Sequence, residues 1–159
     1  MNILEYENYQ EKITLSDPDF AYITYLCSIP LDFPQVPLHW HDEMEFIYVK
    51  KGIGMVSVDF QPYVVEAGSI ILILPGQLHA IDQLGDACME YENIIFHPNI
   101  LISKTADSCN TNLLLPFING SIAVPTHLNR QMTFIHKSLP VSMRTMKLEK
   151  PFRKVTNSF

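Results

Sequence analysis

The 159-residue chain lacks long apolar runs, and its first residues lack the pattern of a secretory signal. Its longest uninterrupted apolar run, residues 70–74, is far shorter than the roughly 20 residues that a membrane-spanning helix needs. Residues 1–12 are polar and acidic, whereas a secretory signal carries basic residues followed by an apolar stretch. We therefore expect a cytoplasmic protein that does not enter a membrane.

Cysteine is scarce, and a disulfide framework is excluded on that ground. The three cysteines, Cys27, Cys88 and Cys109, are odd in number and far apart in the sequence. Small disulfide-dependent domains carry even numbers of cysteines at close spacing. We expect reduced thiols and a fold that depends on its apolar core.

Basic charge is also scarce over most of the chain. Residues 1–129 carry four basic and sixteen acidic side chains, whereas residues 130–159 carry seven basic and one acidic. Non-specific affinity for nucleic acid comes mostly from neutralised phosphates, so we expect no DNA binding by this chain alone. We interpret the basic tail, residues 140–159, as solvated or docked on the acidic body.

Apolar residues make up 47% of the chain, enough for one domain with one core. Short segments rich in β-branched and aromatic residues alternate with glycine and proline turns, and residues 50–54 are predicted to connect two strands as a hairpin. This spacing predicts an all-β barrel or double-sheet jelly roll. The predicted strands are residues 20–29, 46–49, 55–58, 63–65, 69–74, 79–81 and 89–96.

The same pattern divides the chain into four parts. We predict an N-terminal arm over residues 1–19, a β-barrel over 20–98, a helical or irregular extension over 99–139, and the basic tail. Within the extension, a short helix is predicted over 113–118 and a weaker one over 128–139.

Three histidines and one glutamate stand out. His39, His41 and Glu45 share one parity, so an extended segment points them to the same side. His79 follows a buried strand and a tight turn that can return it to the same place. Imidazoles with a carboxylate suit Zn, Ni, Fe, Mn or Cu, although the four groups could also hydrogen-bond one another without a metal. The sequence predicts a shared inward-facing site.

Neighbouring residues have weaker signals. Ile47 and Met55 are candidates for the inner wall of the site, or plain core residues. Trp40 has the opposite parity to the histidines and is predicted to pack outward against the N-terminal arm. Glu43 shares the face of the histidines and is the only candidate general base, although it could equally lie at a solvent-exposed mouth.

Two segments resemble the motifs of the cupin superfamily. Residues 39–52 follow the pattern His-x-His-x3-Glu-x6-Gly of the first motif, and residues 68–79 are similar to the second. Phe33 and Gln83 stand where the two motifs usually have glycine and asparagine. The resemblance implies a cupin-type double-stranded β-helix, a jelly-roll barrel with a short C-terminal helical segment. It also implies metal ligands at His39, His41, Glu45 and His79.

A narrower resemblance covers residues 20–117. Residues 37–49 and 94–101 are similar to the sensor domain of AraC-type transcriptional regulators. That resemblance implies a small effector, often carbohydrate-like, bound by His39, His41, Glu45 and His79, and a homodimer. It also implies a DNA-binding helix-turn-helix part of roughly a hundred residues, for which this chain is too short.

The predicted function is therefore effector sensing without catalysis. The alternative is a small metal-dependent cupin enzyme, a dioxygenase or isomerase, in which a metal polarises the substrate or activates oxygen. A third interpretation, a barrel that only dimerises, would leave a buried polar constellation without a role.

Overall fold

The computed structural model describes residues 3–11, 22–102 and 107–129. The helical elements are α1 (Ile3–Glu7), η1 (Pro98–Ile100), the π-helix η2 (Asn110–Leu114) and α2 (Leu115–Ile118). The strands are β1 (Tyr22–Ile29), β2 (Gln35–His39), β3 (Met44–Val58), β4 (Gln61–Glu66), β5 (Ile70–Ile73), β6 (His79–Asp82), β7 (Met89–Phe96) and β8 (His127–Leu128).

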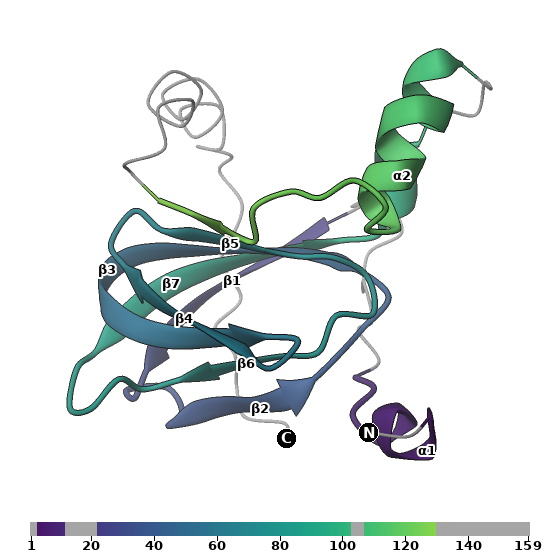
Figure 1. The fold of residues 1–159 in the computed structure, drawn as a ribbon. Coiled ribbons are helices and arrows are strands. Elements are labelled where there is room, and N and C mark those ends of the chain that lie inside the picture. The colour runs from purple at the N-terminus through teal and green to yellow at the C-terminus, as the bar shows by residue number, and fades with distance from the viewer. Residues whose placement is uncertain (1–2, 12–21, 103–106, 130–159) are drawn as a thin grey trace.

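The strands form an all-β barrel made of two antiparallel layers (Figure 1). One layer has the order β1-β7-β3-β5-β8, and in the other β3 pairs with β4 and β6, and β6 pairs with β2. The predicted all-β class and jelly-roll barrel of the cupin type are confirmed. The core lies between the layers and is mostly aliphatic; its fully buried members include Ile29, Ile47, Ile71, Ile81 and Tyr91.

Strand β3 is continuous and belongs to both layers. Residues 44–52 pair with β5 and β7, and residues 53–58 pair with β4 and β6. A register shift between Val49 and Lys51 and a φ of 76° at Gly52 bend the strand between the layers. The predicted hairpin at residues 50–54 is therefore wrong, because the chain bends there without folding back on itself.

The hairpin lies further along, at Asp59 and Phe60. Both residues have positive φ, 48° and 66°, as the two central residues of a hairpin turn that matches the twist of its strands require. This turn joins β3 to β4.

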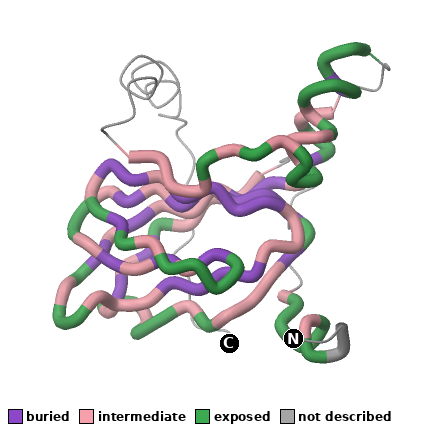
Figure 2. Tube along the Cα trace, viewed as in Figure 1, coloured by how far each residue is buried: buried purple, intermediate pink, exposed green. Residues whose placement is uncertain are grey.

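The chain beyond the barrel returns to it. Helices η2 and α2 confirm the predicted helix over 113–118 and project from the barrel, with much of their surface exposed (Figure 2). The first residue of the helix predicted over 128–139 belongs instead to strand β8, which pairs with β5. Residues 130–139 and the basic tail lie outside the described residues. Among the described helices, none is long and apolar enough to cross a membrane.

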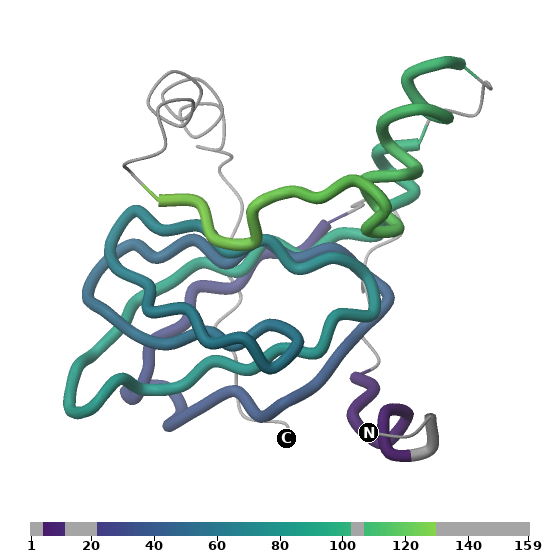
Figure 3. The backbone as a smooth tube through the Cα atoms, in the orientation of Figure 1, coloured from purple at the N-terminus to yellow at the C-terminus, as the bar shows by residue number. Residues whose placement is uncertain are grey.

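The N-terminal segment also contacts the barrel. After α1, the chain reaches the connection between β2 and β3 (Figure 3). There Gln10 forms a parallel bridge with Trp40. The predicted strand over residues 20–29 is observed as β1, and residues 12–21 lie outside the described residues.

Candidate functional site

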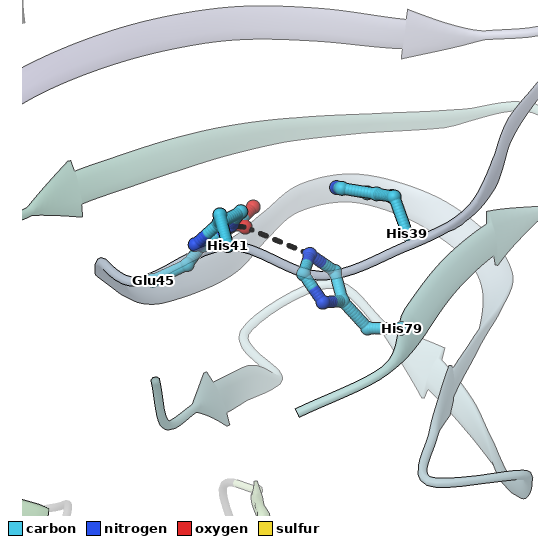
Figure 4. Close-up of side chains that lie close together, drawn as sticks. All are labelled: His39, His41, Glu45 and His79. Atoms are coloured by element: carbon cyan, nitrogen blue, oxygen red, sulfur yellow. Dashed lines mark hydrogen bonds and ion pairs between the residues drawn. The ribbon is translucent and has the colours of Figure 1, made fainter. Parts of the chain in front are cut away.

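The four residues predicted to share a site lie together inside the barrel (Figure 4). His39 ends β2, His41 lies in the connection to β3, Glu45 is on β3, and His79 begins β6. One ligand atom from each residue lies within 4.8 Å of those of the other three. We call these four side chains the tetrad. The β2–β6 register places His39 directly opposite His79, so two segments 40 positions apart in the sequence meet at one point.

The tetrad is buried and has one accessible edge. His41, Glu45 and His79 are 1%, 2% and 0% exposed. The His39 side chain is 16% exposed. A solvent molecule or ligand therefore meets the tetrad first at His39.

Each imidazole is oriented by the main chain. In every ring, Nδ1 lies within hydrogen-bond distance of a carbonyl oxygen two residues away in the sequence. The distances are 2.8 Å from His39 to Pro37, 3.1 Å from His41 to Glu43, and 2.9 Å from His79 to Gln77. A carbonyl oxygen can only accept, so each Nδ1 donates, and a neutral ring then presents a lone pair at Nε2.

Those lone pairs face carboxylate oxygens. The Nε2 atoms of His41 and His79 each lie 3.1 Å from the same oxygen, Oε2 of Glu45. Nitrogen lone pairs and an anionic oxygen repel one another unless a proton or a cation lies between them. The tetrad is thus incomplete without positive charge at its centre.

The ionisation of Glu45 and His79 follows from that contact. Burial favours a neutral Glu45, but hydrogen bonds from His41 and His79 outweigh it and hold the pKa of Glu45 below its ordinary value. Burial likewise opposes the charge on His79, yet the hydrogen bond and charge of Glu45 raise the pKa of His79. In the metal-free protein a proton shared with His79 supplies part of the missing charge.

A divalent transition metal also fits this donor set. Three Nε2 lone pairs and one carboxylate converge, and each ring's other nitrogen is held by a carbonyl, as is usual for histidines that bind metals. His39, His41, Glu45 and His79 would hold the ion. A bound ion would act as a Lewis acid toward an oxygen atom of a ligand.

A fifth group, Glu11, reaches the tetrad from the N-terminal segment. Its Oε2 lies 3.2 Å from Nε2 of His39. Burial raises the pKa of Glu11. Burial and the neighbouring charge of His79 lower the pKa of His39 to about 4. Sequence reasoning missed Glu11, because no periodicity in residues 1–19 indicates which of their carboxylates returns to the barrel.

Trp40 holds that segment in place, as its parity predicted. Its ring stacks on Tyr6 with centroids 4.6 Å apart and planes 14° apart. Its Nε1 donates to the Tyr6 carbonyl at 2.8 Å, and the Tyr6 hydroxyl donates to the carbonyl of Gly76. The prediction that Trp40 packs against the N-terminal arm is confirmed.

The remaining predicted residues lie in different places. Ile47 is fully buried in the interior cluster. Met55 is only partly buried. It lies directly opposite Val64 on the neighbouring strand, so the two side chains share one face of the sheet, and Val64 is 55% exposed. That face is the outer one, and the expectation that Met55 lines the inner wall is wrong. The register shift before Gly52 reverses the alternation, so Gly54 and the residues of its parity face inward instead.

Glu43 lies behind His41. Its carboxylate oxygen is 3.7 Å from Nδ1 of His41, whereas the tetrad gathers around Nε2. In this arrangement Glu43 is placed to orient the His41 ring, and it does not face the centre of the tetrad as a general base would.

Residues 32–111 match the family model of the AraC-like ligand binding domain. Two proteins named as uncharacterized HTH-type transcriptional regulators of Bacillus subtilis are similar. YdeC is 28% identical over 93 residues, which cover 54% of this chain and 32% of YdeC. YbfI is 21% identical over 116 residues, which cover 73% of this chain and 42% of YbfI. The chain thus spans less than half the length of these relatives.

Solved structures are similar as well. A cupin protein from Bacteroides fragilis is 20% identical with a TM-score of 0.49, over 64% of this chain and 94% of that one. A cupin-like protein from Thermotoga maritima is 18% identical with a TM-score of 0.44, over 52% of this chain and 64% of that one.

Proposed function

Because this chain belongs to the family of AraC-like ligand-binding domains, we propose that its barrel is the sensing part of a transcription regulator. In this proposal a small effector binds at the tetrad. The observation that carries it is the convergence of four ligand atoms within 4.8 Å inside a mostly apolar barrel. Buried polar groups without a partner are costly, and binding sites are the usual reason for such a cluster.

The donor set favours a ligand rich in oxygen. The Nε2 lone pairs of the imidazoles accept hydrogen bonds from hydroxyl groups, and the hydroxyl oxygens accept from protonated rings or contact a bound ion. A carbohydrate-like effector offers both. Apolar neighbours such as Ile47 would then supply the desolvation, while the tetrad sets the orientation of the ligand. A divalent ion such as Zn, Ni, Fe or Mn at the tetrad belongs to the same proposal.

A thermal-shift screen of sugars, polyols and sugar acids tests this function. An effector at a hundredfold excess over its Kd adds about 2.7 kcal/mol of stability, which raises the Tm of a domain this size by roughly 5–10 °C. The shift should disappear in Glu45→Gln and His41→Ala and persist in Glu66→Gln, an exposed carboxylate outside the tetrad. An effector that stabilises the tetrad variants as strongly as the wild type would disprove the proposed site.

The metal-compatible donor set keeps an enzymatic alternative open. A dioxygenase or isomerase would need a resident metal, so protein purified without added metal should contain near-stoichiometric Fe, Mn or Ni. Glu43 does not face the centre of the tetrad, which favours sensing over catalysis. Elemental analysis that finds no resident metal would therefore disprove the enzymatic alternative, whereas the sensing proposal holds with or without a bound ion.

The homodimer is also a proposal. Leu113 and Leu115, on the helices that project from the barrel, are 57% and 43% exposed. Exposed leucines on a projecting helical segment are available for contact with a second copy of the chain. Sedimentation of the Leu113→Glu variant at several concentrations tests it, and an unchanged dimer would place the contact elsewhere.

A further inference from the structure

The accessible edge of the tetrad already holds a carboxylate from the chain itself. Glu11 Oε2 lies 3.2 Å from Nε2 of His39, the least buried member of the tetrad. Glu11 comes from the N-terminal segment and does not belong to the barrel. Its carboxylate stands where a ligand entering past His39 would first contact the tetrad.

The position of Glu11 is fixed by its main chain, while its side chain is free to leave. The amide of Glu11 donates to the carbonyl of Trp40 at 2.8 Å, and the amide of Trp40 donates to the carbonyl of Tyr9 at 2.9 Å. The Glu11 side chain is 40% exposed, so it can rotate into water with a small loss of buried surface. The segment need not detach for the edge of the tetrad to become free.

The chemistry at this edge suits an anionic oxygen. His39 donates its Nδ1 hydrogen to Pro37, so its Nε2 presents a lone pair toward the Glu11 oxygen. The contact is favourable when a proton lies between the two atoms or when positive charge lies at the centre of the tetrad, and such charge attracts a carboxylate more strongly than a neutral hydroxyl. The structure therefore shows a carboxylate beside His39, at the accessible edge of the tetrad.

We propose that Glu11 is an internal substitute for the carboxylate of an acidic effector, and that the site binds small organic carboxylates which replace Glu11 beside His39. This inference rests on the proposed sensing function and names its ligand class. Glu11 then competes with the effector, so the apparent affinity is reduced by the fraction of molecules in which Glu11 occupies the edge.

The matched ligands gluconate and sorbitol test the proposal. Both are open six-carbon chains with hydroxyl groups, and they differ by a carboxylate in place of one terminal alcohol. Isothermal titration of the full chain measures their affinity, first with one equivalent of Zn²⁺ and again after chelation. In the zinc-loaded protein, gluconate and acetate should bind about tenfold more tightly to Glu11→Gln than to the wild type. Sorbitol should gain less than twofold. Glu7→Gln is the control, because it removes an exposed carboxylate of the same segment and changes the net charge equally.

Three results would overturn the inference. One is an unchanged carboxylate affinity in both Glu11→Gln and Glu11→Ala, with folding confirmed by circular dichroism. Another is an equal gain for sorbitol or in Glu7→Gln. The third is no carboxylate binding to any variant. If a neutral compound still stabilises the wild type through Glu45 and His41 in that case, the sensing function stands and only the ligand class is wrong.

Discussion

The three imidazoles of the tetrad share one arrangement, in which the main chain takes Nδ1 and leaves Nε2 facing inward. This arrangement makes the site depend on what supplies positive charge at its centre. In the metal-free protein only protons can do so, and burial resists them most clearly at His39. The pH dependence of stability should therefore reveal the tetrad.

The metal-free protein should lose stability between about pH 6.5 and pH 4. Burial lowers the pKa of His39 to about 4 in the folded protein, against about 6.5 in the unfolded chain. As the pH falls through this window, the unfolded chain takes up a proton that the folded protein does not, so the free energy of unfolding decreases by up to about 3 kcal/mol. Urea unfolding at pH 7, 6, 5 and 4 with a chelator measures it.

The His39→Asn variant is the comparison for that curve. It lacks the titrating ring and should lose less stability over the same window. Glu45 affects the free energy of unfolding at lower pH, because its depressed pKa delays its protonation in the folded protein to below about pH 4.3. His79 affects it at higher pH: its pKa is raised in the folded protein, so its contribution to stability is lost as the pH rises above about 6.5. Equal slopes for His39→Asn and the wild type would mean that His39 does not titrate as its burial implies.

Parity in the sequence predicted which of these residues meet, but the structure places His39, His41 and Glu45 on β2, on the connection and on β3, not on one extended strand. The shared parity of His39, His41 and Glu45 is visible in the sequence, and a strand followed by a tight turn returned His79 to them. Met55 was misplaced because one irregularity in the strand reverses the parity of every residue after it.

At the scale of elements, β3 determines the shape of the barrel. It passes from one layer to the other at Gly52, where the main chain approaches the carbonyl of Cys88 so closely that a Cβ would overlap its oxygen. The two lysines and two glycines of residues 50–54 predict a hairpin from local pattern alone. The strand stays continuous because it pairs with β5 and β7, and this long-range pairing leaves no local signal in the sequence.

Gly52→Ala should destabilise the barrel by more than about 2 kcal/mol, because it combines a positive φ of 76° with the overlap at Cys88. Gly85→Ala is the matched control: its φ is also positive, at 57°, but a Cβ there meets no described heavy atom within 4 Å. It should cost about 1 kcal/mol. Chemical denaturation of both variants measures the difference, and equal losses would show that the close approach to Cys88 contributes nothing.

At the scale of the whole molecule, the two layers close around a site assembled from β2, β3 and β6. The barrel itself could be predicted, because short strands at regular intervals with glycine and proline turns leave few alternatives. The order of the strands and the approach of the N-terminal segment could not, because both depend on contacts between residues far apart in the sequence.

A metal bound at the tetrad should stabilise the whole barrel, since its ligands come from strands of both layers. At a thousandfold excess over its Kd, Zn²⁺ or Ni²⁺ would add about 4 kcal/mol and raise the Tm by roughly 10 °C. Differential scanning calorimetry with the ion and then with a chelator measures this shift. His79→Gln should abolish it, and a shift that survives in that variant would place the bound ion outside the tetrad.

The stacking of Trp40 on Tyr6 has a practical consequence. The chain contains one tryptophan, so all indole emission comes from Trp40. The main-chain carbonyl of Trp40 accepts the amide hydrogen of Glu11, and its ring stacks on Tyr6. The molecule thus carries its own optical reporter beside the entrance to its site. A change in the intensity or wavelength of that emission on addition of a ligand would report a change in the surroundings of Trp40 in real time, without an attached dye.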